Sequence, residues 1–544
     1  MSSFWTLFKV TLKNMLRFDR KKGTLPLMIV GFAAVGLVFG FMIVAGTLGI
    51  GQYFVEYDAV PEFLTILFLI TQAVVLIFGT ATIVGVMFFS RDTEFVLALP
   101  VRSSVLFFAK LTYVYLTELL ISAFVVLTGG ITMGLMAGMG GGYFLLLIVA
   151  VFLLPVLPLL LAALLSLPIM YLLSFFRYKG ALTSVVLLLL FAAALVGWYA
   201  VFGGMMGSDE TIVLPEEAIL ALKQAMAWVI PDISLARLIC GVDVLPTLGI
   251  TVGVFAALGG LACAVSAGIF RRSLSAQLEQ TRTAKAGKVE YRRSSAARAL
   301  LKKDFKEIFR NPTLAFYTLL QVAFCPIMLL ILGLMTQSFE GMAEEAAAAS
   351  LTAVIEGLFF LGMIAVSMNY TALSTLTREG ENFPLMKTFP LPFGEQIRTK
   401  VLLARLITAV SVAVGCLTLT FFLRGEIWQN AFLLVFLLIY GDGITHLLCS
   451  FDISNPKLHY ESLSAALKNN VNSFKAMGVA LAVIVPAALL YVLAFSLGQS
   501  GALPYPYVVI AAWILLIGGA AVLNVVFRRI LYRNVERRVA RIED

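Results

Sequence analysis

Long apolar runs alternate with short polar segments along this chain. Each run holds about 20 or more residues, which is enough for a helix to cross about 30 Å of hydrocarbon. Backbone groups inside a bilayer must satisfy their own hydrogen bonds, and these runs lack the alternation of barrel strands, so the pattern predicts an all-α polytopic membrane protein. Twelve transmembrane spans are predicted, at about 26–50, 63–89, 105–128, 143–172, 181–204, 245–270, 313–337, 351–375, 400–423, 431–451, 476–496 and 507–527.

The composition and the placement of charge support this class. Hydrophobic residues make up 60% of the chain and charged residues 13%, which excludes an ordinary soluble domain. With both termini placed in the cytoplasm, only Lys223, Arg237 and Arg424 of the 40 Lys and Arg residues lie on the outer side. The positive-inside rule therefore predicts cytoplasmic termini. Contact with anionic membrane lipids accounts for the net charge of +9 without nucleic acid.

The chain repeats its own landmarks after six spans. A basic preface, FKVTLKNMLR at 8–17, returns as LKKDFKEIFR at 301–310, and an Arg-x-x-Glu segment follows the second span of each block, at Arg91–Glu94 and Arg378–Glu381. Because six spans return the chain to its starting side, both blocks enter the membrane in the same direction, and the pattern predicts two parallel six-helix repeats. The predicted division is 1–270 for the first block, 271–296 for a basic cytoplasmic linker and 297–544 for the second block.

Each preface predicts a helix in the cytoplasmic interface of the membrane, over 4–22 and 297–311. In the second preface Leu301, Phe305 and Phe309 recur at every fourth position, and cations follow one position later at the same period. An apolar stripe beside a basic stripe is typical of a helix that lies in the interface. The cations are Lys9, Lys13 and Arg17 in the first preface and Lys302, Lys306 and Arg310 in the second.

A further surface helix is predicted at 215–230, in the outer loop between the fifth and sixth spans. The segment PEEAILALKQAMAWVI begins with a proline and two glutamates, which favour a helix start. Its apolar face would hold Ile219, Leu222, Met226 and Val229. This pattern predicts a short helix that lies on the outer surface of the membrane.

The sequence holds no motif for a bound nucleotide, a metal or covalent catalysis. No Gly-x-x-x-x-Gly-Lys-Ser/Thr loop occurs, and the Gly287–Lys288 pair is followed by valine. The two histidines and five cysteines form no cluster with metal-ligand spacing, and no nucleophile elbow is present. We therefore expect this chain to be no enzyme and to hold no catalytic residue, metal or cofactor. Any energy source is expected to be a partner chain or an ion gradient.

Few ionisable residues fall inside the predicted spans. A charge near the bilayer centre costs at least about 2.5–3.5 kcal/mol, so each should face protein or water. Asp442 and His446 stand one helical turn apart, where they form a polar spot on a transport path, a proton relay, or an internal pair that fixes helix packing. Glu118 and Glu356 are further candidates for a transport path, although Glu356 is also compatible with a place near the outer surface. Arg405 is expected to extend toward the inner face.

The cytoplasmic segment after the tenth span is unlike a plain loop. It reads DISNPKLHYESLSAALKNNVNSFK over 452–475, with an Asn-Pro turn and an amphipathic stretch. It resembles bacterial ABC exporter permeases of about twelve spans, which carry here an Asp, a Pro-Lys/Arg-Leu, an aromatic residue and a Lys-x-Asn-x-Asn stretch. The aromatic residue of that pattern is more often Trp than Tyr. The matching residues are Asp452, Pro456, Lys457, Leu458, Tyr460, Lys468, Asn470 and Asn472.

The resemblance implies a membrane subunit that works with separate ATP-binding cassette ATPases. Two copies of the ATPase, with ATP and Mg bound to them, would drive alternating access and export at the bacterial cytoplasmic membrane. The loops between the second and third spans of each block, at 91–104 and 378–399, would rest on these ATPases. The residues expected to couple the two proteins are Arg91, Glu94, Pro100, Arg378, Glu381, Pro390 and Pro392.

Two other functions are compatible with the sequence. A secondary transporter driven by an ion gradient can also consist of two parallel six-span blocks with a basic linker, although few membrane acids are available here for proton coupling. The chain could instead be a non-transporting membrane partner of an ATPase. Recovery of an ATPase together with the chain would exclude the secondary transporter and leave the ABC permease and the non-transporting partner.

Overall fold

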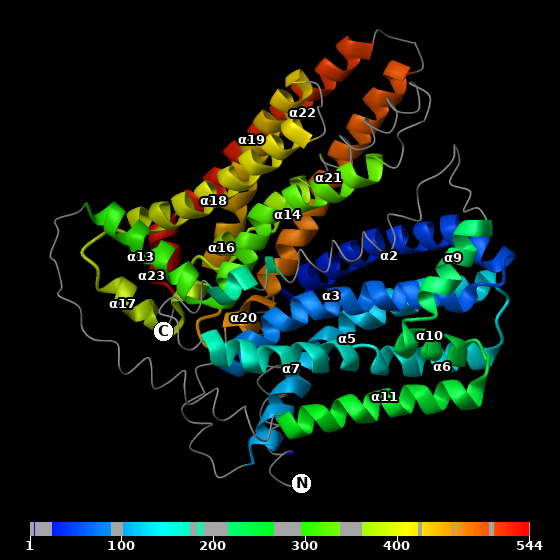
Figure 1. Ribbon diagram of the computed structural model, residues 1–544. Coiled ribbons are helices and arrows are strands. Elements are labelled where there is room, and N and C mark those ends of the chain that lie inside the picture. Colours follow the sequence, from blue (N-terminus) through cyan, green and yellow to red (C-terminus); the bar gives the residue numbers. More distant parts are fainter. Residues whose placement is uncertain are drawn as a thin grey trace. The chain divides into compact units, whose positions relative to one another are not determined.

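In the computed structural model of this protein, the secondary structure of the described residues consists of helices (Figure 1). The structure describes residues 5, 24–88, 102–173, 182–186, 188–189, 216–265, 295–337, 359, 362–422, 427–460, 463–468, 470–499 and 505–542. Within these residues no strand occurs, and nine helices are long and apolar enough to cross a membrane. The prediction of an all-α polytopic membrane protein is therefore confirmed. Most of the preface helix at 4–22, of the fifth span and of the linker 271–296 lies outside the described residues.

The described residues group into two compact units. Those of 36–287 form unit 1, and those of 20–35 and 288–544 form unit 2. The boundary at residue 287 falls inside the predicted linker, whereas the beginning of the first predicted span groups with unit 2.

Unit 1 is built around α3, which packs against α5 and α7. Its helices are α2 (Thr24–Glu56, from Gly36 onward), α3 (Val60–Phe88), α5 (Ser103–Met136), α6 (Gly141–Leu153), α7 (Val156–Leu173), α9 (Glu216–Met226), α10 (Ile230–Ile239) and α11 (Val244–Val265). A Cβ atom at Gly130 of α5 would lie 2.8 Å from Leu147 of α6, so glycine is what lets these two helices approach so closely.

The fourth predicted span, 143–172, is two helices rather than one. α6 ends at Leu153, and α7 begins at Val156 after a turn at Leu154 and Pro155. Proline has no backbone N–H and its ring clashes with the preceding turn, which interrupts the helix at this point.

The helix predicted at 215–230 is present as α9, but it ends at Met226, and Val229 of the predicted face lies beyond it, at the start of α10. Its predicted apolar face is the buried one, because Ile219, Leu222 and Met226 are all buried in a cluster with Phe54 and Phe63. The short helix therefore packs on the ends of α2 and α3 within unit 1. Its position on a membrane surface stays a prediction.

Unit 2 is built around α19, which packs against α18 and α22 (Figure 1). Its helices are α13 (Ala296–Arg310), α14 (Pro312–Gln337), α16 (Tyr370–Leu373), the 3₁₀ helix η3 (Thr377–Asn382), α17 (Phe383–Lys387), α18 (Phe393–Phe422), α19 (Ile427–Ser454), α20 (Leu463–Lys468), α21 (Val471–Gln499), α22 (Tyr505–Tyr532) and α23 (Val535–Ala540). Trp513 is fully buried and meets the rings of Phe359 and Tyr491 at 5.7 and 5.6 Å between centroids. This aromatic cluster joins α21 to α22.

The second preface forms α13, in agreement with the predicted helix at 297–311. The face that packs on unit 2 carries Asp304 and Ile308, whereas Phe305 is 53% exposed and contacts Phe309 beside it. Of the predicted apolar stripe, Phe305 is thus exposed, whereas Leu301 and Phe309 are half-buried, and contact of this helix with lipid stays a prediction.

The loop between the second and third spans of the second block begins and ends earlier in the sequence than predicted. The helix expected to continue to residue 375 stops at residue 367, and α18 begins at Phe393 rather than near residue 400. The buried Asn369 is the N-cap of the next short helix, α16: its side chain accepts a hydrogen bond from the Ala372 N–H at 2.9 Å and donates to the Ala404 carbonyl at 3.0 Å. The coupling loop, residues 368–392, is defined here by these limits.

Candidate functional site

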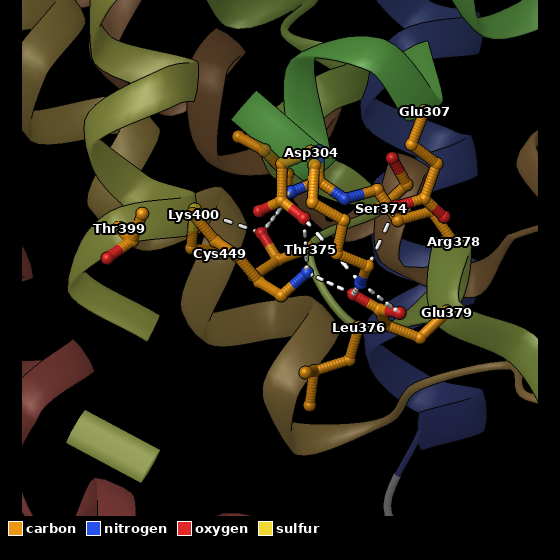
Figure 2. Close-up of polar contacts among 12 residues, drawn as sticks. Asp304, Glu307, Ser374, Thr375, Leu376, Arg378, Glu379, Thr399, Lys400 and Cys449 are labelled. Carbon is orange, nitrogen blue, oxygen red and sulfur yellow. Dashed lines mark hydrogen bonds and ion pairs between the residues drawn. The ribbon is translucent and has the colours of Figure 1, made fainter. Parts of the chain in front are cut away.

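A cluster of charged side chains, four of them buried, holds the coupling loop against the rest of unit 2 (Figure 2). Its members come from α13, η3 and α18, and they are the acids Asp304, Glu307 and Glu379 and the cations Lys303, Arg378 and Lys400. Segments about 75 and 95 residues apart in sequence thus meet at one point.

The ion pairs of this cluster are close and mostly out of contact with solvent. Arg378 Nη2 lies 3.1 Å from Asp304 Oδ2, and Lys400 Nζ lies 3.3 Å from Asp304 Oδ1. Lys400 also pairs with Glu379, which accepts bonds of 2.7 and 2.8 Å from Lys303. The side chains of Asp304, Arg378, Glu379 and Lys400 are at most 5% exposed, so each charge depends on its partners rather than on water.

The pKa values of the two glutamates show how the charges are compensated. Burial by itself raises the pKa of Glu379, but Lys400 and Lys303 outweigh it and lower that pKa to about 2. Burial and the neighbouring Glu379 raise the pKa of Glu307. Glu379 is therefore ionised at neutral pH and serves as the anionic partner of both lysines.

The same three acids could in principle bind a metal. Their carboxylate oxygens lie within 4.8 Å of one another. However, one cation for each acid already occupies the cluster, and positive side chains within ion-pair distance oppose the entry of a metal ion. The arrangement is better suited to clamping the coupling loop than to binding a metal.

Asp452 holds the coupling loop from the other side. Its buried carboxylate accepts hydrogen bonds from the backbone N–H groups of Leu376 and Thr377, at 2.6 and 3.0 Å, and from the Thr377 hydroxyl. That hydroxyl in turn accepts a bond from the Lys457 N–H at 3.1 Å, and the Tyr460 hydroxyl donates to the Arg378 carbonyl at 3.3 Å. The first part of the cytoplasmic motif is thus folded onto the coupling loop.

The remaining motif residues connect the end of α19 to the start of α21. Asn472 is fully buried and donates to the Asn455 carbonyl at 2.9 Å, and its own N–H donates to Asn470 at the same distance. Leu458 is buried in the core of unit 2, and Pro456 lies in the turn before it. Lys468 is the last residue of α20.

The tip of the coupling loop is presented to solvent. Phe383 and Met386 anchor α17 in the core, while Leu385 between them is 58% exposed. Glu381, Pro390 and Pro392 are also exposed. An exposed leucine among prolines on a loop braced from two sides is suited to contact with another protein.

The residues predicted to couple the chain to a partner therefore differ in their surroundings. Arg378 is buried against Asp304, so it supports the loop from within, whereas Glu381, Pro390 and Pro392 lie on its surface. In the first block Arg91, Glu94 and Pro100 lie outside the described residues.

Lys110 and Lys400 each follow a proline of the preceding loop, Pro100 and Pro390, by ten residues, and both side chains bind an earlier segment of their own unit. Lys110 is buried in α5 and donates to the Val86 carbonyl of α3 at 3.1 Å. Lys400 is buried in α18 and pairs with Glu379, just after the second span of its block.

Inside the spans, the structure gives Asp442 a partner that the sequence did not indicate. Asp442 pairs with Arg405 of α18 and accepts a bond of 2.9 Å from Asn524 of α22. A Cβ atom at Gly443 would lie 3.0 Å from the backbone of Asn524, so the glycine permits this approach of α22. Arg405 therefore meets an acid in the neighbouring helix instead of only extending toward the inner face.

His446 and the remaining membrane acids have separate surroundings. The His446 ring nitrogen Nδ1 lies 2.6 Å from the Asp442 backbone oxygen and 3.9 Å from its carboxylate. Glu118 is fully buried in unit 1, and a Cβ atom at Gly79 of α3 would lie 3.7 Å from its carboxylate. Glu356 lies outside the described residues.

Sequence reasoning missed the acids of the charge cluster. Asp304, Glu307 and Glu379 were overlooked because their segments read as basic and cytoplasmic. One signal was available in the repeat itself. In the shared register of the prefaces, Thr11 and Asn14 stand where the second block has Asp304 and Glu307, so only the second preface carries acids.

Comparison with known proteins places the chain among twelve-span membrane proteins. The sequence profile of a family described as "Membrane protein of 12 TMs" matches residues 27–525. No curated protein and no solved structure matches the chain.

Proposed function

Because the chain belongs to this family of twelve-span membrane proteins, we propose that it is the membrane-spanning permease subunit of a bacterial ABC transporter. It works as an exporter at the cytoplasmic membrane, with both termini in the cytoplasm. Two separate ATPase subunits, which bind ATP and Mg, drive the alternation of access.

The observation that carries this proposal is the coupling loop, which has a braced interior and an exposed tip. Its interior is fixed by Asp304 and Lys400 on one side and by Asp452 on the other. A force applied at Leu385 would therefore reach α13, α18 and α19 together, instead of being absorbed by a soft loop. This is the mechanical requirement for coupling a motor protein to transmembrane helices.

The packing inside each unit supports two parallel blocks of six spans. In both units the third predicted span contacts the fourth, as α5 with α6 and as α18 with α19. The fourth also contacts the sixth in both units, as α7 with α11 and as α19 with α22. Closure of the two ATPases would tilt these blocks against each other and open the path to the other side of the membrane.

The first experiment is purification of the tagged chain from its native membrane in mild detergent. We expect an ATPase with a Walker motif to be recovered with it at about two copies per chain. A Leu385→Glu substitution is expected to abolish this recovery, because it places a charge at the exposed apolar tip of the loop. Arg298→Glu, on the exposed start of α13, is the matched control and should retain the ATPase.

A second candidate function is a secondary transporter driven by an ion gradient. The pair of Asp442 and Arg405 favours it, because both residues lie in helices long enough to span the membrane. Absence of any ATPase in the purification, together with transport that collapses on addition of a proton uncoupler, would decide for this carrier.

A further inference from the structure

A pocket rich in arginine lies at the C-terminal end of α22. It has a volume of about 400 Å³ and is lined by Ile530, Arg533, Asn534, Arg537, Arg538 and Arg541. No acidic side chain is among these residues.

The backbone conformation of one residue creates this pocket. Asn534 has a positive φ of 57°, which ends α22 and starts α23 in a new direction. The turn brings the arginines of α23 to the same place as Arg533, the last arginine of the preceding segment. Arg533, Arg537 and Arg541 are exposed there.

Two neighbouring side chains keep the pocket positively charged. Arg538 donates to the Ile530 carbonyl at 3.1 Å and to the Ser450 carbonyl of α19 at 2.9 Å, so it forms a fixed wall. Glu536 is the acid closest in sequence, but it accepts bonds from the Phe393 and Gly394 N–H groups at the start of α18. Its charge is therefore engaged by the α18 N-terminus, where carboxylates are favoured.

An apolar strip leads to this pocket along α22. Val522, Val526 and Ile530 stand one helical turn apart and are 64%, 43% and 44% exposed. They belong to a helix of sufficient length and apolarity to span the membrane. The strip ends at Ile530, which is itself part of the pocket lining.

We infer that the pocket binds the phosphodiester headgroup of an anionic phospholipid. The headgroup is held by Arg533, Arg537 and Arg541, and an acyl chain lies along Val522 and Val526. Guanidinium groups bind phosphate oxygens through paired hydrogen bonds, and basic pockets beside spanning helices select anionic lipids. A membrane lipid fits better than a soluble acidic partner because the apolar strip continues the pocket into the bilayer.

The test uses the purified full-length chain in a nonionic detergent and native mass spectrometry. Phosphatidylglycerol is titrated against phosphatidylcholine with the same acyl chains. We expect phosphatidylglycerol to bind more tightly, and the Arg533→Gln/Arg537→Gln double variant to reduce its affinity about thirtyfold. The matched control is Arg528→Gln/Arg529→Gln, which removes the same charge from exposed residues of α22 outside the pocket and should change the affinity by less than about threefold.

Three outcomes would overturn the inference. Equal losses in the two double variants would mean that the whole basic end of the helix attracts anions without a site. Displacement of phosphatidylglycerol by the same concentration of glycerol 3-phosphate would assign the pocket to a soluble phosphate. Unchanged binding in Val526→Gln, which leaves every arginine in place, would show that the acyl chain does not lie along the strip. This variant also tests the inference if the arginine variant does not fold.

Discussion

At the residue scale, the candidate site depends on charges that compensate one another away from water. Asp304 sits between Arg378 and Lys400, and Glu379 sits between Lys303 and Lys400. Removing one member leaves another charge buried without its partner, which costs more than the pair contributes as a whole. Two atoms of Arg378, Nε and Nη1, are already buried without a hydrogen bond among the described residues, so the loss of a further partner of Arg378 would not be compensated by them.

Glu379→Gln should lower the free energy of unfolding by about 3–5 kcal/mol at neutral pH, because it leaves Lys400 with only Asp304. In the folded protein the pKa of Glu379 is about 2, which is below its ordinary value of 4.5. The stabilisation is thus present at neutral pH and is lost as the pH falls from about 4.5 toward 2. The difference between wild type and variant, measured by denaturant unfolding in detergent, should shrink over this pH interval.

The exposed neighbour Glu381 provides the control for that measurement. Glu381→Gln should change the free energy of unfolding by less than about 0.5 kcal/mol. Equal effects of the two substitutions would show that the buried pairs do not stabilise the loop.

Asp442→Asn tests the pair inside the spans. The substitution leaves Arg405, which is 44% exposed, without its carboxylate partner, and a decrease of up to about 3 kcal/mol in stability is expected. Adding Arg405→Gln should restore part of the loss, because the unpaired charge is then removed as well. A thermal unfolding series of the two single variants and the double variant measures this coupling, and additive losses would contradict it.

At the element scale, short irregular segments connect the long helices into one mechanical unit. In the coupling loop, Asn369 caps the start of α16 and Gly380, with a positive φ of 53°, reverses the chain inside η3. The cytoplasmic motif then fastens this loop through Asp452. The long helices supply the membrane spans, and these small elements hold α13, α18 and α19 to one another.

Asp452→Ala is expected to release the coupling loop. It leaves the buried N–H groups of Leu376 and Thr377 without acceptors, at a cost of about 3 kcal/mol or more. Hydrogen exchange should accelerate over residues 376–380, while α22 keeps its protection. Tyr460→Phe removes one bond of 3.3 Å and should have an effect of about 1 kcal/mol or less. Unchanged exchange in Asp452→Ala would show that the motif does not hold the loop.

At the scale of the whole molecule, the distribution of positive charge predicts which ends of the helices face the cytoplasm. The coupling loop and the outer segment around α9 should lie on opposite sides of the membrane. Each carries a suitable exposed position, since Leu385 is 58% and Trp228 is 85% exposed.

Cysteine labelling in intact cells tests this orientation. In a background without the native cysteines, Trp228→Cys should react with a membrane-impermeant maleimide added outside. Leu385→Cys should react only after the membrane is permeabilised. The reverse pattern would overturn the predicted topology, and with it the cytoplasmic position of the coupling loop.

The long helices and the amphipathic segments were predictable because each follows from local periodicity. The apolar face of α9 is the predicted one, since Ile219, Leu222 and Met226 are buried. The limits of the coupling loop were not predictable, because Asn369, where the loop begins, is held by hydrogen bonds to Ala404 and Thr408, about 35–39 residues away. The charge cluster was missed for the same reason, since a charged residue in a basic segment reads as solvated until its distant partners are known.

The sequence by itself determined that this is a twelve-span helical membrane protein, because the lipid environment requires long apolar helices and these are visible as runs in the chain. Only the tertiary structure decided which charges are buried and which face solvent. Asp304, Glu379 and Lys400 become a clamp only when three separate segments meet, since the energy of an ion pair depends on distance and desolvation, and neither is encoded in local order along the chain.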